Sequence, residues 1–231
     1  MVWSLCDCLR RCAQLRCYVP EPLDETWGRL RHLGARREWL IAESTSQVQQ
    51  MRDLLECVWP AALDTAKHPF RSATWPAAMS VILDRDGADL ARTRRRGLAR
   101  FEAAVRREIT RRGGQRPCLR IVRRLFAALT DPAGVLTHRP GALERVQLLL
   151  QDWRETQRRL ADTETRMTTV LDELHPTELA TSITGLTALG AAAILAGTGD
   201  LTRFATARAL VKQALGTCGG SSGDTPGALM R

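Results

Sequence analysis

The sequence predicts an all-α protein, made of an extended helical and coiled-coil linker, a partial helix-hairpin-helix-like domain, and disordered ends. Two observations carry this prediction. First, only 5% of the 231 residues are aromatic, and the abundant Ala, Leu, Arg and Glu favour helices over sheets. Second, apolar residues recur at alternating steps of three and four over two long stretches, which is the period of a helix that packs against another helix.

The N-terminal residues, 1–22, form a predicted leader without regular order, because they have neither a helical nor a strand period and end in Pro20 and Pro22. Four of the seven cysteines cluster here with the spacing C-x-C-x₃-C-x₄-C, from Cys6 to Cys17. That spacing differs from the paired pattern of structural zinc sites, so no metal site is predicted. An odd number of cysteines, several of them far apart, favours reduced thiols over disulfides.

The first convincing helix is predicted from about Glu25 to Val58, with Asp24 as its cap and Pro60 ending it. Its apolar stripe consists of Ile41, Val48, Met51, Leu55 and Val58. A stripe this narrow predicts that the helix packs against a second helix.

Three tryptophans lie in or beside this helix, at positions 27, 39 and 59. Aromatic rings at helical spacing usually pack in a core, so we predict core positions for Trp27, Trp39 and Trp59, with base stacking as the alternative. From Pro60 to Pro76 we expect an irregular connecting loop, and then a short apolar helix from Ala77 to Leu83.

A basic helix is predicted from Gly87 to Arg112. The segment from Arg92 to Arg124 holds thirteen arginines, no lysine and two acidic residues, a local charge of +11, whereas the whole chain carries +9. The predicted buried face is Leu90, Phe101, Val105 and Ile109. The candidate nucleic-acid-binding residues project elsewhere: Arg94, Arg95, Arg96, Arg100, Arg106, Arg107, Arg111 and Arg112. Guanidinium suits bidentate phosphate contact, so we predict nucleic-acid binding; a solvated charged face is the alternative.

The cleanest periodicity lies in a coiled-coil helix predicted over 141–175, after a shorter helix from Leu119 to Leu129. Its seam is Leu143, Val146, Leu150, Trp153, Gln157, Leu160, Glu164, Met167, Leu171 and Leu174. Gln157 and Glu164 cost stability at such positions and would fix register or strand number. The seam fits an intramolecular antiparallel hairpin with the first helix as well as pairing with a second chain.

Near the C-terminus, Ile183 to Thr187 predicts a tight turn in which Gly185 can take positive φ, followed by a small-residue helix from Ala188 to Ala196. This is the outline of a helix-hairpin-helix, whose turn N–H groups and helix N-terminus face a phosphate. Gly185 and Thr187 are therefore further nucleic-acid-binding candidates. The alternative is a Gly/Ala-rich helix pair packed tightly in a core. A last helix is expected from Ala207 to about Leu215.

This stretch resembles the start of the C-terminal domain of the transposase family of the insertion-sequence one-ten/one-sixteen type. The similar segments are Ile183–Leu186, Gly190–Ala196, Thr198–Asp200 and Arg203–Lys212, and further back Glu25–Trp27, Arg29–Gly34, Met51–Glu56, Trp59–Leu63 and Arg139–Val146. The resemblance covers about Pro20 to Lys212. It implies a helical linker over 23–175 and the start of the C-terminal domain over 177–213, behind a RuvC-like acidic domain and ahead of a serine-bearing segment.

For the parent family the resemblance implies RNA-guided DNA recombination, with carboxylates that hold Mg²⁺ and a serine that attacks the phosphodiester. In this chain Asp7 is the only carboxylate before Glu21, and Ser221 and Ser222 lie in a small, polar tail over 214–231 that is predicted to be disordered. We therefore assign no catalytic residue and expect no cofactor in this chain. The two ends read as frame-displaced translation, so we predict a truncated transposase that binds DNA without autonomous catalysis.

The expected partners are DNA, a guide RNA by resemblance, and a second copy through the coiled coil. A non-catalytic coiled-coil protein that associates with full-length transposase and inhibits it is the alternative, and an independent metal-using nuclease is disfavoured by the missing carboxylates. No stretch approaches the roughly 18 apolar residues of a membrane span, and Asp7 and Arg10 stand where a signal peptide would be apolar. A soluble, cytoplasmic protein is predicted.

Overall fold

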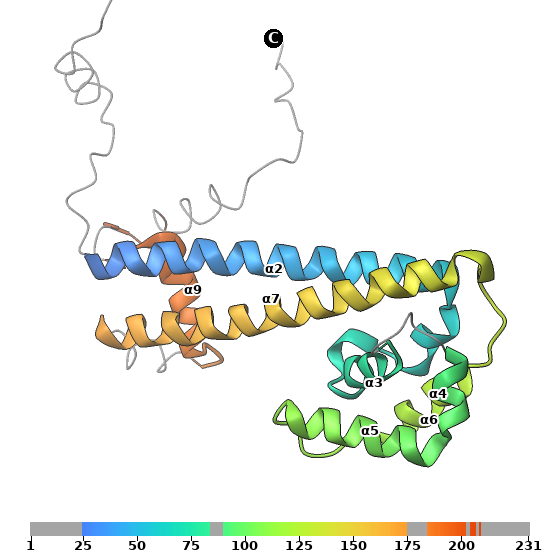
Figure 1. Cartoon of the computed structure of the whole chain (residues 1–231). Coiled ribbons are helices and arrows are strands. Elements are labelled where there is room, and N and C mark those ends of the chain that lie inside the picture. Colours follow the sequence, from blue (N-terminus) through green and yellow to red (C-terminus); the bar gives the residue numbers. More distant parts are fainter. Residues whose placement is uncertain (1–24, 84–89, 175–183, 202–203, 207, 209–231) are drawn as a thin grey trace, which may run out of the picture. The chain divides into compact units, whose positions relative to one another are not determined.

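The computed structural model describes residues 25–83, 90–174, 184–201, 204–206 and 208, and every regular element among them is a helix (Figure 1). In chain order these are α2 (Glu25–Val58), η1 (Pro60–Thr65), η2 (Pro69–Arg71), α3 (Thr74–Leu83), α4 (Leu90–Arg96), α5 (Leu98–Arg111), α6 (Leu119–Ala128), η3 (Leu136–His138), α7 (Arg139–Glu173) and α9 (Ala188–Thr198). The all-α prediction is confirmed. The predicted leader, the tail, residues 177–183 at the start of the C-terminal domain, and residues 207 and 209–215 of the last helix lie outside the described residues.

The chain divides into two compact units: unit 1 comprises residues 1–37 and 163–231, and unit 2 comprises residues 38–162. In unit 1, α9 crosses α2 and α7 and packs its small residues against both (Figure 1). The core of unit 1 is Leu30, Met167, Val170, Leu171, Ala191, Ala192, Leu195 and Ala196. A Cβ added at Gly34 would lie 2.5 Å from the Cβ of Ala196, so the close approach of α9 to α2 depends on this glycine.

Unit 2 has a core of larger side chains, contributed by α2, α7 and the helices between them. Its fully buried members include Trp59, Trp75, Met79 and Leu125. Both indoles find acceptors inside this core, since Trp59 Nε1 donates to the carbonyl of Ala128 at 2.9 Å and Trp75 Nε1 donates to that of Ala62 at 2.9 Å.

The seam of α7 is covered by α2 in each unit, in the antiparallel sense. In unit 1 the Arg37 guanidinium lies 2.9 Å from the Glu164 carboxylate. In unit 2, Gln157 Nε2 donates to Ser44 Oγ at 2.7 Å. Each of the two polar seam positions is thus paired with α2 inside its own unit, and pairing of the seam with a second chain stays a prediction.

The predicted stripe of α2 is confirmed at Met51, Leu55 and Val58, which are buried, but it is wrong at its N-terminal end. Ile41 is 37% exposed, whereas Leu40 and Gln47 are buried. The reason is a polar pair that periodicity of apolar residues cannot reveal, because Gln47 Nε2 donates to Thr156 Oγ1 on α7 at 3.2 Å and takes a core position. Trp39 is 57% exposed, so its predicted core position is wrong, while that of Trp59 is confirmed.

The segment from Pro60 to Pro76, predicted as an irregular loop, instead contains η1, η2 and the first turn of α3. Trp75 and Pro76 are buried, and α3 begins at Thr74 rather than at Ala77. The indole of Trp75 explains the order of this segment, because its hydrogen bond to Ala62 ties α3 to η1.

The predicted single basic helix is two helices in the structure. Gly97 has φ of +83°, a conformation that glycine adopts without strain but that interrupts a helix, and it separates α4 from α5. Residues 87–89 lie outside the described part of the chain. The predicted buried face is confirmed, since Leu90, Phe101, Val105 and Ile109 are all buried.

Candidate nucleic-acid interface

The arginines of α4 and α5 point outward because the apolar residues of these helices are held in the core of unit 2. Phe101, Val105 and Ile109 recur at steps of four on α5 and are between 0% and 3% exposed. The rest of the helix surface is therefore left to polar side chains. All eight predicted arginines are exposed: Arg94, Arg95, Arg96, Arg100, Arg106, Arg107, Arg111 and Arg112.

The two carboxylates of this region neutralise only a few of its arginines. Glu108 pairs with Arg111, with 3.0 Å between Oε2 and Nη1, and also with Arg112. Glu102 pairs with Arg123 on α6 at 2.9 Å. Five arginines form no ion pair with any described residue: Arg94, Arg96, Arg100, Arg106 and Arg107. Most of the positive charge of α4 and α5 thus remains open to a partner.

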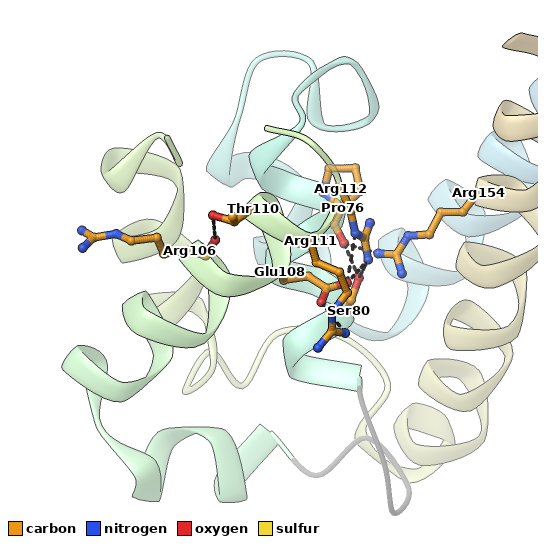
Figure 2. A network of polar contacts seen from close by, with 8 residues as sticks. All are labelled: Pro76, Ser80, Arg106, Glu108, Thr110, Arg111, Arg112 and Arg154. Carbon is orange, nitrogen blue, oxygen red and sulfur yellow. Dashed lines mark hydrogen bonds and ion pairs between the residues drawn. The ribbon is translucent and has the colours of Figure 1, made fainter. Parts of the chain in front are cut away.

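Arg112 has a structural role besides its charge, as Figure 2 shows. Its Nη2 donates to Ser80 Oγ on α3 at 3.1 Å, and Ser80 Oγ donates to the carbonyl of Pro76 at 2.7 Å. Arg154 of α7 donates to the same carbonyl at 2.6 Å. In Figure 2 Arg106 points away from this network. Arg112 thus helps to hold α5 against α3, whereas Arg106 faces outward.

Arg154 is the most strongly perturbed guanidinium near this surface. Burial lowers its pKa to about 10, assisted by the nearby Arg112 and opposed by Glu108. A group with this pKa stays charged at neutral pH. Arg154 therefore adds to the positive potential around α5 while anchoring α7 to α3.

A groove of about 400 Å³ lies among α3, α4 and α5 and contains part of the predicted site. Arg96, Arg100 and Arg107 line it. Sequence reasoning missed its other walls, which are Val81, Thr93, Phe101, Ala103 and Ala104. The spacing of residues 100, 103, 104 and 107 on one helical face was the signal that could have revealed it.

The two remaining predicted residues, Gly185 and Thr187, belong to unit 1. Gly185 has φ of +86°, as the predicted tight turn requires. Thr187 is the N-cap of α9, and its Oγ1 accepts a hydrogen bond from the Gly190 N–H at 3.0 Å. Its side chain therefore satisfies the helix end, and phosphate contact by this turn stays a prediction.

Among the residues that the structure describes, no group of three or more His, Cys, Asp and Glu side chains is placed to hold a metal ion. The described residues therefore do not fit the carboxylate set that the family resemblance implies for Mg²⁺, and we derive no chemical step through a metal. Within the same residues, none of the helices combines the length and the apolar character that a membrane crossing requires.

Comparison of the chain with protein-family models, with curated proteins and with solved structures found no match.

Proposed function

We infer that this chain is a DNA-binding protein of the insertion-sequence transposase type, which holds nucleic acid on the arginines of α4 and α5. The observation that supports the binding function is the set of five exposed arginines without ion-pair partners among the described residues, two on α4 and three on α5. The transposase assignment rests on the sequence resemblance alone.

Phosphate is the ligand that this surface suits best. Arginine presents a planar fork of donors that matches a phosphate in bidentate fashion and is less strongly hydrated than lysine. The segment uses arginine throughout and contains no lysine. A surface of this kind attracts a polyanion at long range and releases counterions when it binds, so its affinity depends steeply on salt.

The test is the salt dependence of binding to a labelled duplex, followed by fluorescence anisotropy. Changing Arg100, Arg106 and Arg107 to Gln should lower the affinity on the order of a hundredfold at low salt and reduce the slope of log affinity against log salt by about 3, because about one counterion is released per phosphate contact. These three side chains are exposed and have no ion pair among the described residues, so the fold should tolerate the changes.

A matched control removes the same charge from another surface. Arg31, Arg36 and Arg52 are exposed residues of α2 without an ion pair in the described part of the chain. Changing all three to Gln should alter the affinity by severalfold at most, through the lost net charge. Equal losses of affinity in the two triple variants would show that net charge alone governs binding, and α5 would then not be the binding surface. An affinity that does not depend on salt would contradict the proposal as a whole.

The second candidate is a non-catalytic interaction protein that joins full-length transposase and inhibits it. It is favoured by apolar side chains that α2 and α7 leave exposed in unit 2, namely Trp39 and Leu148, which are 57% and 55% exposed. Because α2 already covers the seam of α7, association would use such outer positions. Inhibition of a full-length relative at substoichiometric amounts would favour this candidate, and unchanged recombination would exclude it.

A further inference from the structure

One face of α5 is built as a recess between two arginines. Arg100 and Arg107 are seven residues apart, which places them on the same side of the helix about 10 Å apart along its axis. Ala103 and Ala104 occupy the same side between them, and all four line the groove of about 400 Å³. Two methyl groups thus stand where longer side chains would fill the space between the cations.

Apart from Thr93 and the three arginines, the residues that line the groove are apolar. Val81 of α3 and Phe101 of α5 supply apolar surface, and Arg96 at the end of α4 adds a third guanidinium. Phe101 is 2% exposed, so it offers only an edge to a ligand. An apolar recess with a few convergent charged groups is the usual construction of a small-molecule subsite, and 400 Å³ lies within the range of such sites.

The N-terminus of α5 opens beside the same arginines. Gly97 is its N-cap and provides no side-chain hydrogen bond to the first turn, so that turn contains N–H groups without a capping acceptor. The helix dipole adds positive potential at this end. Arg96 directly precedes Gly97 and Arg100 lies in the first turn of α5, so two of the three arginines that line the groove lie close in sequence to a helix end that favours an anion.

We propose that this groove receives an unpaired nucleotide, with the base in the apolar recess and the adjoining phosphates on Arg96, Arg100 and Arg107, so that the chain prefers single-stranded to duplex nucleic acid. The inference rests on the proposed function. A duplex keeps its bases stacked inside and presents phosphates to a protein surface, whereas a single strand can turn a base outward. Guanidinium planes at the rim can stack on that base.

The experiment compares three probes of about 12 nucleotides, a length within the site sizes of single-strand binders: oligothymidylate, an abasic strand of equal charge, and a duplex. The full chain should bind oligothymidylate about tenfold more tightly than the abasic strand, because the base supplies the difference. This comparison requires no variant. Equal affinity for the two single strands would overturn the inference.

A variant locates the effect in the groove. Ala104→Leu adds volume to the recess without changing charge, and it should abolish the tenfold preference while leaving affinity for the duplex within about twofold. Ala127→Leu, at an exposed alanine of α6 that does not line the groove, is the matched control and should retain the preference. An unchanged preference in a folded Ala104→Leu chain, checked by circular dichroism, would also overturn the inference.

These outcomes distinguish a failure of the nucleotide groove from a failure of the proposed function. If no probe binds, or if binding ignores salt, the proposed function fails. If all three probes bind with the expected salt dependence and with equal affinity, the arginine surface stands and only the nucleotide groove is excluded.

Discussion

Unit 1 packs α2 and α7 against a helix of small residues, whereas unit 2 packs the same two helices against large side chains. In unit 1 the contact is made by Ala191, Ala192 and Ala196 of α9. In unit 2 the space is filled by residues such as Trp75 and Leu125, both almost fully buried. The core of unit 1 depends on backbones that lie close together, whereas the core of unit 2 depends on the volume of its side chains. Unit 1 should therefore be most sensitive to larger residues, and unit 2 to smaller ones.

The difference extends to function. The small-residue face of α9 is used in packing, which favours the tightly packed helix pair over a phosphate-facing hairpin as the role of that face. By contrast, α5 buries its apolar residues and leaves its arginines in solvent. The described part of α9 thus serves packing in unit 1, whereas unit 2 carries the surface that we propose to bind nucleic acid.

The largest effect on stability is expected from shortening a buried side chain in unit 2. Leu125 is 0% exposed, so Leu125→Ala should lower the free energy of unfolding by about 2 to 5 kcal/mol through lost apolar burial and the cavity left behind. Leu148→Ala, at a leucine that is 55% exposed, should change it by no more than about 0.5 kcal/mol. Urea unfolding followed by circular dichroism measures both. A loss below about 1 kcal/mol for Leu125→Ala would mean that this core is loosely packed.

The next largest effect is expected from replacing a glycine by alanine in unit 1, where the position decides whether stability rises or falls. Gly34→Ala should destabilise by about 1 to 3 kcal/mol, because its Cβ would lie 2.5 Å from the Cβ of Ala196. Gly28→Ala, on the same helix with no atom within 4 Å of its Cβ, should instead stabilise by about 0.5 to 1 kcal/mol through helix propensity. If the urea midpoint rises in both variants, α9 does not approach α2 closely in solution.

The smallest effect is expected at Thr187, and it tests whether the turn before α9 contacts nucleic acid. Thr187→Ala removes the N-cap of α9 and should cost about 1 kcal/mol of stability. We expect its affinity for a duplex to stay within about twofold of the original, because the Thr187 side chain serves the helix end. A severalfold loss of affinity with a shallower salt slope would instead place the turn at Gly185 in the nucleic-acid interface. Binding would then involve unit 1 as well as unit 2.

Local signals were sufficient for several elements. Asp24 as a cap and Pro60 as a stop predicted α2 from about Glu25 to Val58, which are its observed bounds. The buried face of α5 followed from spacing alone, and this in turn placed the candidate arginines in solvent. Such features depend on one helix and its own period, so they can be read without knowledge of a partner.

Other features depended on contacts between distant residues. Gln47 takes a core position in which its Nε2 donates to Thr156 on α7, and in the same part of α2 Trp39 and Ile41 face outward. The groove likewise needs Val81 of α3 beside Arg96 and Arg107, which lie beyond it in sequence. No periodicity along a single helix contains this information.

By itself, therefore, the sequence determined the helical class, the bounds of α2 and the outward placement of the arginines, because propensity, proline and apolar period act within a few residues. The tertiary structure decided that α2 covers the seam of α7, that α9 packs against them through Gly34 and Ala196, and that Gly97 separates α4 from α5. These outcomes follow from which surfaces meet in space, where close packing and the pairing of buried polar groups select one arrangement among those that the local pattern allows.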